Sequence, residues 1–285
     1  MKVVVTGAGG QLGKALAATA PETIEVRSLL RAECDLSAPA SIADAITAHR
    51  PDLLINAAAY TAVDRAEAEV DQAMRVNGEA VMVMREALAR YGGRLVQIST
   101  DFVFDGTSSR AYAPDARRNP LSVYGLSKAA GEDAAGEDAL IVRTSWVYAA
   151  GGGNFVRTML RLMRERDSLS VVQDQIGAPT LASGLAATIW ALAGQGATGI
   201  FHHRDAGVAS WYDFAVAIQE EALALGMLTC AIPIRPIPSS AYPVPARRPA
   251  FSLLDDSTTR ALLGDAPPHW RANLRTMLKE EQTLG

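Results

Sequence analysis

The stretch Lys2-Val-Val-Val-Thr-Gly-Ala-Gly-Gly-Gln-Leu-Gly13, at the start of the chain, decides the fold that we expect. Its first five residues are mostly apolar and β-branched, which is typical of a buried parallel strand. Gly7, Gly10 and Gly13 follow at a spacing of three, before a helical pattern from residue 14 to residue 20. Glycine allows a tight turn close to phosphate, and the helix N-terminus offers N–H donors to it. A plain flexible loop is the alternative, but strand, glycines and helix in this order favour a dinucleotide-binding turn.

Further apolar runs alternate with helical patterns along the first half of the chain. We expect strands at residues 3–6, 24–28, 53–56, 94–99 and 139–143, with helices between them at about 39–49, 69–91 and 122–136. Such alternation implies parallel strands joined by right-handed crossovers. The expected fold class is therefore α/β, a Rossmann-type doubly wound parallel sheet with a smaller C-terminal α/β substrate domain.

The pattern changes after residue 146. Glycines at 151–153 mark a loop, and Asn154 can cap a helix that runs to about residue 166. A strand at 169–172, a helix at 181–193 and a short strand at 200–202 follow. The proline-rich stretch 232–249 is either a linker or, as we prefer, an ordered extended segment around a cleft. We expect residues 1–150, with a returning segment near 178–203, to bind the dinucleotide. Residues 151–177 and 204–285 would form the substrate domain.

Tyr124 and Lys128 are the pair with the most chemical content. At a spacing of four they lie on one face of the helix expected at 122–136. A lysine cation beside a phenol favours the phenolate, so we expect Lys128 to lower the pKa of Tyr124 toward a useful range for proton transfer. A solvated helix surface is the alternative for this pair taken alone.

Composition excludes several classes of protein. A net charge of −4 argues against a nucleic-acid surface, and no apolar run is long enough to cross a bilayer. The N-terminus lacks the pattern of a signal peptide. Cys34 and Cys230 lie far apart without metal-binding spacing, which fits a reducing cytoplasm. The four histidines form no metal motif, so we expect no metal site and a cytoplasmic protein.

The chain resembles the extended short-chain dehydrogenase/reductase family over nearly its whole length. The glycine turn and Tyr124–Lys128 are general to that superfamily. Three segments are more specific: Arg143-Thr-Ser-Trp-Val-Tyr148, Asp174-Gln-Ile-Gly-Ala-Pro-Thr180 and Ala241-Tyr-Pro-Val-Pro-Ala-Arg-Arg-Pro249. The resemblance implies reduction of the C4 ketone of dTDP-4-dehydro-β-L-rhamnose to dTDP-L-rhamnose by hydride from NADPH or NADH. That reaction ends dTDP-rhamnose biosynthesis, which supplies cell-wall polysaccharide.

The resemblance also implies roles for individual residues. Tyr124 would donate a proton, Lys128 would hold the nicotinamide ribose and stabilise the phenolate, and Thr100 would donate to the carbonyl oxygen. Substrate contacts are expected from Val63, Thr100, Asp101, Phe102, Trp146 and Arg247. The expected cofactor-binding residues are Gly7, Gly10, Gln11, Leu12, Gly13, Arg31, Asp35, Leu36, Ala57, Ala58, Ala59, Tyr60, Thr61, Ile98, Tyr124 and Lys128.

Structural alternatives exist for several of these residues. Thr100 could be a satisfied strand-end hydroxyl, Asp101 a turn aspartate and Trp146 a core indole. Arg247 and Arg248 suit a pyrophosphate, or they form a surface ion pair, and one of them can face the substrate while the other faces the protein.

The choice of cofactor depends on the end of the second strand. It is Ser28-Leu-Leu-Arg31, with no carboxylate before Glu33 to bind the 2′-hydroxyl of NAD. We therefore expect NADPH, with Arg31 near its 2′-phosphate, and NADH as a possible second cofactor. Some family members dimerise through magnesium held by a carboxylate where this chain has Ala15. We expect no such bridge, no metal requirement for the chemistry, and a monomer or weak homodimer.

Other functions share parts of this pattern. A sugar-nucleotide dehydratase usually carries Thr-Asp-Glu in the catalytic loop, whereas this chain has Thr100-Asp-Phe102, which favours simple reduction. An epimerase is a second alternative. A non-catalytic NADP-binding regulatory subunit, like that of animal methionine adenosyltransferase, is a third.

Overall fold

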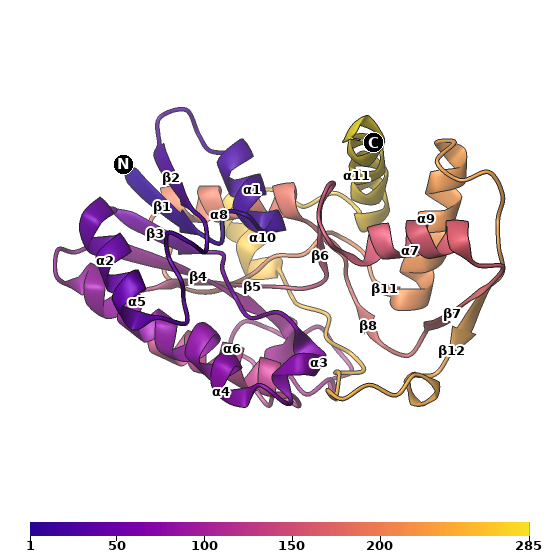
Figure 1. The fold of residues 1–285 in the computed structure, drawn as a ribbon, viewed down its shortest axis with the longest axis horizontal. Coiled ribbons are helices and arrows are strands. Elements are labelled where there is room, and N and C mark those ends of the chain that lie inside the picture. The colour runs from indigo at the N-terminus through magenta and orange to yellow at the C-terminus, as the bar shows by residue number, and fades with distance from the viewer. Residues whose placement is uncertain (285) are drawn as a thin grey trace.

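A sheet of six parallel strands forms the larger lobe of the protein in the computed structural model, which describes residues 1–284 (Figure 1). Its strand order is β10-β5-β4-β3-β1-β2. The strands are β1 (Lys2–Thr6), β2 (Glu25–Leu29), β3 (Leu53–Asn56), β4 (Arg94–Thr100), β5 (Leu140–Thr144) and β10 (Gly199–His202). Each matches an expected strand to within two residues. The order reverses at β1, as a doubly wound sheet requires, so the expected fold class is confirmed.

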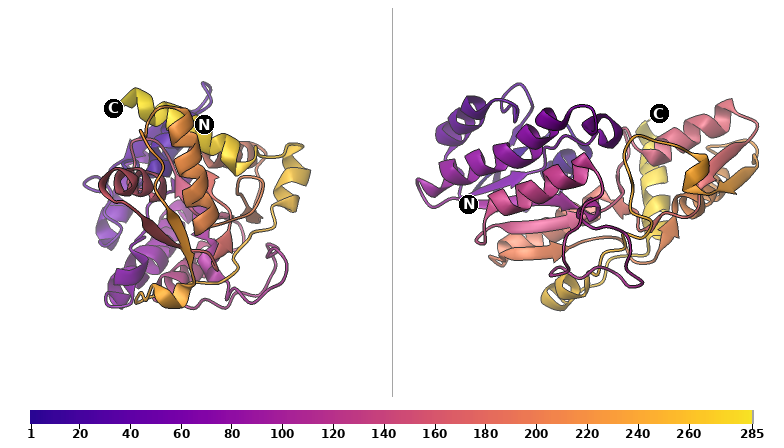
Figure 2. Two further views of the ribbon diagram at one scale, coloured as in Figure 1. Left: turned by 90° about the vertical axis from the view of Figure 1, so that its right-hand side faces the viewer. Right: turned by 90° about the horizontal axis from the view of Figure 1, so that it is seen from below.

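Helices cover both faces of the sheet, and its inner strands β1 and β3 are correspondingly rich in buried Val, Leu and Ile (Figure 2). Helices α1 (Gln11–Ala18) and α8 (Ala182–Gly194) pack together on one face. There the indole N–H of Trp190 donates to the Leu16 carbonyl at 3.2 Å. Helices α2 (Pro39–His49), α5 (Ala80–Ala89) and α6 (Val123–Ala135) cover the other face. Ile46, Met84 and Leu88 are buried in the core beneath them.

The helix expected at 69–91 is interrupted. It consists of α4 (Val70–Met74), a π-turn η1 (Arg75–Glu79) and then α5, and it follows the short α3 (Val63–Ala66). Helix α6 packs tightly against the π-turn, because a Cβ added at Gly131 would lie 2.1 Å from the carbonyl oxygen of Asn77. Single π-turns within helices are frequent at functional sites, and this one places Asn77 beside the cleft described below.

The smaller lobe has its own core around Leu160, Phe214 and Trp270. Three helices surround it: α7 (Phe155–Glu165), α9 (Trp211–Ala224) and α11 (Trp270–Leu284). Strand β7 (Leu169–Val172) pairs in parallel with β12 (Ile234–Ile237), and β8 (Ile176–Gly177) pairs antiparallel with β11 (Ala209–Ser210). The sequence analysis did not predict α9 or α11.

The proline-rich stretch is ordered and extended. It contains the edge strand β12, with Pro236 inside it, and a short 3₁₀ turn η3 (Ser239–Ala241). The chain then runs beneath the larger lobe, where Arg248 forms a two-point ion pair with Asp64 at 2.8 and 3.1 Å. Helix α10 (Ser257–Leu263) packs against β10. Part of the region expected to form the substrate domain therefore contacts the dinucleotide lobe, and the proposed domain limits stay a prediction.

The two lobes are also joined near the middle of the chain. Strand β6 (Val147–Tyr148) leaves β5 for the smaller lobe, and it pairs in parallel with β9 (Thr180–Leu181), which leads back into α8. This crossing places the residues after β5 at the boundary of the lobes.

Candidate active site

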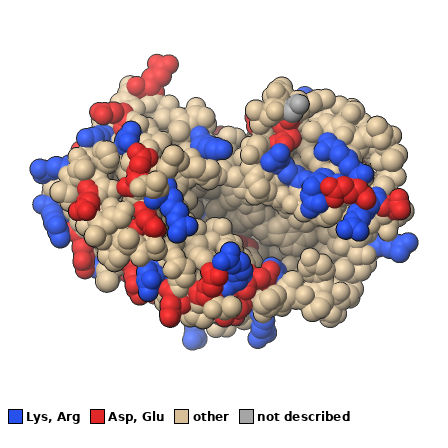
Figure 3. All heavy atoms as spheres, in the orientation of Figure 1, with Lys and Arg blue, Asp and Glu red and all other residues tan. Residues whose placement is uncertain are grey.

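A cleft of about 2050 Å³ lies between the two lobes and receives the carboxyl ends of the parallel strands. Figure 3 shows it as a deep hollow whose walls are mostly uncharged. Pockets for one drug-sized ligand measure roughly 300–1,000 Å³. The cleft therefore has room for two ligands lying side by side.

The glycine turn forms one end of this cleft. Gly7 adopts a φ of +69°, and a Cβ added there would lie 2.7 Å from the Ala58 backbone. A Cβ at Gly13 would lie 2.3 Å from the Gly7 carbonyl oxygen. Helix α1 starts at Gln11 with no acidic residue in its first turn, so its N-terminus is open to an anion. The residues present thus fit a dinucleotide pyrophosphate.

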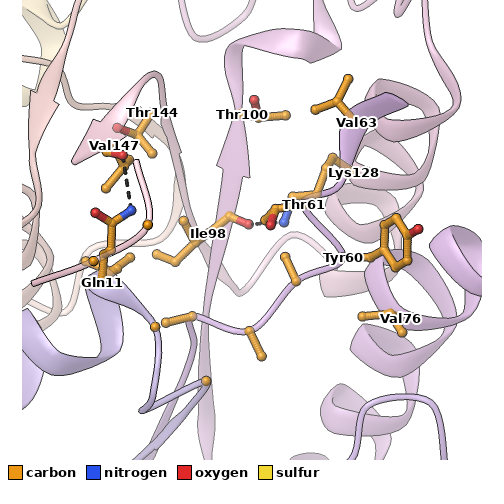
Figure 4. Close-up of a pocket in the computed structure, with 18 of the residues that line it drawn as sticks. Gln11, Tyr60, Thr61, Val63, Val76, Ile98, Thr100, Lys128, Thr144 and Val147 are labelled. Atoms are coloured by element: carbon orange, nitrogen blue, oxygen red, sulfur yellow. Dashed lines mark hydrogen bonds between the residues drawn. The ribbon is translucent and has the colours of Figure 1, made fainter. Parts of the chain in front are cut away.

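Thr100, Tyr124 and Lys128 line the centre of the cleft. Thr100 ends β4, and its hydroxyl accepts from the Phe102 N–H at 3.2 Å. Ser122 caps α6 by accepting from the Gly125 N–H at 3.2 Å, which fixes the first turn that carries Tyr124. The Lys128 Nζ donates to the Ile98 carbonyl at 2.6 Å (Figure 4).

The protonation states differ from the expectation. Burial raises the pKa of Tyr124 to about 12, partly offset by hydrogen bonding to Thr100, with the charge of Asp101 raising it further. Burial lowers the pKa of Lys128 to about 8, against the opposing charge of Glu132. The expectation that Lys128 lowers the pKa of Tyr124 is wrong for the free protein, because burial of the phenol dominates. Tyr124 is therefore a fully protonated donor at neutral pH.

A buried ion pair supports this centre from behind. Glu132, one turn after Lys128, accepts from the Arg143 guanidinium at 2.7 and 2.8 Å and from the Ser99 hydroxyl. Arg143 also donates to the Pro114 carbonyl at 2.9 Å. Both charged side chains are buried, so the pair locks α6 to β4 and β5. The sequence analysis did not assign Glu132 a role, although its position four residues after Lys128 was a usable signal.

Asp101 follows Thr100 and is fully engaged with the protein. One carboxylate oxygen accepts from Thr100 at 3.0 Å, and the other accepts from the hydroxyl of Ser252. Burial raises the pKa of Asp101 to about 6, although both hydrogen bonds lower it. The proposed contact between Asp101 and a sugar hydroxyl stays a prediction, and it requires one of these bonds to be shared or replaced.

Asn77 fixes the loop between β3 and α3. Its side chain accepts from the Tyr60 N–H at 2.8 Å and donates to the Tyr60 carbonyl and to Ser127. Tyr60 and Thr61 thereby line the cleft beside Val76 (Figure 4). Asn77 was missed because only the packing of η1 against α6 gives it this position.

Arg31 lies at the far end of the cleft with a largely exposed side chain, 3.7 Å from Asp35. Glu33, the next carboxylate along the chain, is held by Arg27 and accepts from the Leu30 N–H at 2.9 Å. Arg31 thus forms only a long, exposed ion pair with Asp35, whereas the Glu33 carboxylate is engaged by Arg27 and the Leu30 N–H.

The amino-acid sequence matches the family described as RmlD substrate binding domain over residues 1–283. The chain belongs to this family. It is 46% identical to a dTDP-4-dehydrorhamnose reductase of Burkholderia thailandensis, covering 95% of this chain and 96% of that protein. It is 40% identical to an enzyme of the same name from Aggregatibacter actinomycetemcomitans, covering 97% and 98%.

Two solved structures are also similar to this chain. The crystal structure of dTDP-4-dehydrorhamnose reductase from Bacillus anthracis in complex with NADP is 34% identical, with a TM-score of 0.92 over 98% of this chain and 99% of that one. UDP-glucose 4-epimerase from Thermus thermophilus reaches a TM-score of 0.84 at 19% identity over 99% of both chains, which shows a shared fold only.

Most of the residues expected at the site of this RmlD-family chain lie in the cleft. The lining includes Gly7, Gly10, Gln11, Leu12, Arg31, Asp35, Leu36, Ala57, Ala58, Ala59, Tyr60, Thr61, Val63, Ile98, Thr100, Asp101, Phe102, Tyr124, Lys128 and Trp146. Gly13 is packed behind the glycine turn instead. Arg248 lines the cleft, whereas Arg247 is exposed and lies outside the lining. A substrate contact by Arg247 stays a prediction.

The Gln11 side chain joins the two lobes of this RmlD-family chain. Its carbonyl oxygen accepts from the Ala149 N–H and from Asn154 Nδ2, both at 2.8 Å, and its Nε2 donates weakly to the Val147 carbonyl at 3.4 Å. Figure 4 shows this last contact. Asn154 in turn caps α7. A residue expected only to bind cofactor thus also holds the loop that enters the smaller lobe.

Proposed function

We propose that this protein reduces the C4 ketone of dTDP-4-dehydro-β-L-rhamnose to dTDP-L-rhamnose with NADPH, the last step of dTDP-rhamnose biosynthesis. The observation that carries the proposal is the convergence of Thr100, Tyr124 and Lys128 at the centre of a cleft that has room for two ligands. Membership of the family and 46% identity to a named reductase support the choice of substrate.

The residues of this chain supply and stabilise the proton transfer to the ketone oxygen. NADPH, when bound, supplies the hydride that reduces the ketone carbon. Tyr124 gives its proton to the ketone oxygen, so the phenol O–H bond breaks while the new alcohol O–H bond forms. Lys128 holds its positive charge one helical turn away, where it stabilises the phenolate that results. The net change is uptake of one hydride and one proton.

The glycine turn and the first turn of α1 would hold the pyrophosphate of NADPH. Arg31 would bind its 2′-phosphate, because the side chain of Arg31 is largely exposed at this end of the cleft and the Glu33 carboxylate that could bind a 2′-hydroxyl is already paired. We propose NADPH as the preferred cofactor on this basis, with NADH as a second cofactor. Asp35 and Leu36 line the same end of the cleft and would flank the adenine.

Phe102 distinguishes reduction from dehydration. A dehydratase needs a carboxylate here to remove a proton next to the carbonyl, whereas Phe102 packs edge-on against Tyr124 with ring centroids 5.5 Å apart. The neighbouring Asp101 has both oxygens bonded to protein hydroxyls. The centre is therefore equipped to donate a proton and not to abstract one from carbon.

The direct test is turnover. The protein is incubated with NADPH and dTDP-4-dehydrorhamnose, the loss of reduced cofactor is followed by absorbance, and the product is identified by NMR. We expect stoichiometric oxidation of NADPH and formation of dTDP-L-rhamnose. Absence of NADPH consumption would favour a non-catalytic NADP-binding subunit, and an unreduced product with altered stereochemistry would favour an epimerase.

No helix among residues 1–284 has the length and apolarity needed to cross a bilayer. Within the same residues, no cluster of three or more His, Cys, Asp or Glu side chains is arranged to hold a metal ion. As part of the proposal, the enzyme acts in the cytoplasm as a monomer or weak homodimer without bridging Mg²⁺. Gel filtration with and without EDTA tests the oligomeric part.

A further inference from the structure

Trp146 and Trp211 form a stacked pair at the boundary of the lobes. Their ring centroids are 3.6 Å apart and their planes differ by 12°. Trp146 follows β5, Trp211 begins α9, and both line the cleft. Phe155 packs against the pair from the smaller lobe, 4.7 Å from Trp211. The sequence analysis assigned no role to Trp211.

The backbone at Trp146 is held in an unfavourable conformation. Its φ is +46°, in the left-handed region that bulky residues rarely adopt. The Trp146 carbonyl accepts from the Thr180 N–H at 3.2 Å, and the Ser145 hydroxyl donates to the Ala178 carbonyl at 2.8 Å. A Cβ added at Gly177 would lie 3.2 Å from the indole. The surrounding structure thus imposes this position, and such strain tends to occur at functional sites.

The indole N–H groups divide the four tryptophans into two kinds. Trp190 donates to the Leu16 carbonyl at 3.2 Å, and Trp270 donates to the Val208 carbonyl at 3.3 Å. The N–H groups of Trp146 and Trp211 have no hydrogen-bond partner anywhere in residues 1–284, and neither nitrogen belongs to the buried unpaired atoms of that range. The two tryptophans of the cleft therefore carry free and accessible donors, whereas the two core tryptophans do not.

The stack also limits how a ligand can meet these rings. Trp146 and Trp211 cover one face of each other, Gly177 lies close to the Trp146 indole, and the Phe155 ring contacts Trp211 at a tilt of 53°. A nucleobase or sugar cannot lie flat on an indole face that another group occupies. Both residues line the cleft and both N–H groups are without a partner among residues 1–284, so the N–H groups are the polar atoms that the pair can offer to a ligand.

We propose that Trp211 is a second substrate-contacting residue, which together with Trp146 donates indole N–H hydrogen bonds to oxygen atoms of the sugar nucleotide. The inference rests on the proposed function for the class of ligand, which is rich in hydroxyl and phosphate oxygens. It places Trp211 on the same wall of the cleft as Trp146. Stacking of the two rings would fix the orientation of both N–H donors.

The test uses Trp211→Phe and Trp146→Phe, which keep an aromatic ring in the stack and remove the donor. Calorimetry measures the Kd of dTDP-L-rhamnose, of dTDP and of NADP⁺ for each variant. We expect each substitution to weaken dTDP-L-rhamnose about tenfold, as for one lost hydrogen bond to a ligand, and to leave NADP⁺ within about twofold. If dTDP weakens equally, the acceptors lie in the dTDP part of the ligand, on thymine, deoxyribose or diphosphate; if dTDP is unaffected, they are oxygens of the hexose.

Trp190→Phe is the matched control, because it makes the same change where the N–H already has a partner. It should leave all three Kd values unchanged. Wild-type affinity in Trp211→Phe, or an equal loss of NADP⁺ affinity, would overturn the proposal.

A second measurement needs no substitution at Trp211. In ¹⁵N-tryptophan-labelled wild-type protein, dTDP-L-rhamnose should shift two of the four indole N–H resonances, with Trp190→Phe and Trp270→Phe spectra assigning the two that stay. A Trp146→Phe spectrum then separates the remaining two resonances, and a Trp211 resonance that does not move with dTDP-L-rhamnose would exclude Trp211 as a contact. These are binding readouts, so a protein that binds dTDP-L-rhamnose but fails to reduce the ketone would contradict the proposed function alone.

Discussion

The two walls of the cleft are built in different ways. On the larger lobe, Thr100, Tyr124 and Lys128 are fixed by a strand end and one helix, with the buried Glu132–Arg143 pair behind them. On the smaller lobe, the wall consists of Trp146 and Trp211, which are aligned by ring stacking and by loop contacts. The first wall carries the residues that transfer the proton, a step that does not depend on which sugar nucleotide is bound. The second wall carries residues that contact the ligand, so its residues can differ between enzymes with different substrates. We therefore expect damage to the first wall to lower kcat and damage to the second to raise KM.

Tyr124→Phe is the strongest test of that comparison. It removes the proton donor and keeps the ring, so we expect kcat to fall by about 10²–10⁴-fold while the Kd of NADPH stays within about twofold. Stopped-flow or steady-state absorbance of NADPH measures the rate. An undiminished rate would show that another group donates the proton.

Glu132→Ala tests the support behind the same wall. It leaves the Arg143 guanidinium buried without its partner, so we expect the free energy of unfolding to fall by about 3–5 kcal/mol. Asp133→Ala is the matched control on the same helix: its ion pair with Arg118 is exposed on the aspartate side, and we expect a loss under about 1 kcal/mol. Urea unfolding followed by circular dichroism compares the two, and similar losses would contradict the role of the buried pair.

Arg31→Ala probes the cofactor end of the larger lobe. We expect the KM of NADPH to rise about tenfold, as for one charge-assisted contact, and that of NADH to stay the same, because only NADPH carries the 2′-phosphate. Arg90→Ala, an exposed arginine at the end of α5, serves as the control. A parallel rise for both cofactors would place Arg31 away from the 2′-phosphate.

The pH dependence should come from Lys128 and not from Tyr124. Lys128, with a pKa of about 8, is charged below that pH and supports the phenolate, and the charge is lost as the pH rises through 8. Tyr124, with a pKa of about 12, stays protonated over the same range. We expect kcat/KM to fall above about pH 8, by up to about tenfold per pH unit. A profile that is flat to pH 10 would be inconsistent with this assignment.

Asn154→Ser tests the hydrogen bond between Asn154 of the smaller lobe and Gln11 of the larger lobe, and it should have the smallest effect of these substitutions. Serine keeps the N-cap of α7 but loses the amide donor to Gln11 and to the Ala149 and Gly152 carbonyls. We expect the KM of the sugar nucleotide to rise about threefold to fivefold, the effect of about 1 kcal/mol felt at the substrate wall. The KM of NADPH should not change. Asn154→Ala also removes the cap and should cost about a further 1 kcal/mol of stability. An effect on NADPH alone would mean that the link does not reach the substrate wall.

The larger lobe could be predicted from the sequence because its signals are local. Strand runs, glycines at a spacing of three, and Tyr124 four residues before Lys128 each lie within a short stretch. Asn77, Glu132 and Trp211 could not be assigned roles in the same way, because their contacts join residues far apart in the chain. The pKa of Tyr124 was expected in the wrong direction, since burial in the tertiary structure, which raises it, is not visible in the local sequence.

One further feature could have been predicted from the sequence. The start of α9 carries a reciprocal cap, in which Ser210 and Asp213 bond each other's backbone N–H. That pattern of serine and an acidic residue three positions later was present but unused. Arg247 and Arg248 show the opposite case: neighbours on an extended chain point to different sides, and no local signal indicates which one meets the cleft.

The ion pair between Arg248 and Asp64 has a consequence for how the protein admits its ligands. It ties the returning chain to α3 of the larger lobe, in addition to the β6–β9 pairing and the Gln11 contacts that also join the lobes. Spreading them apart must stretch this attraction, which is partly open to water and is therefore weakened by dissolved ions. Raising the ionic strength should therefore make it easier for the two lobes to move apart.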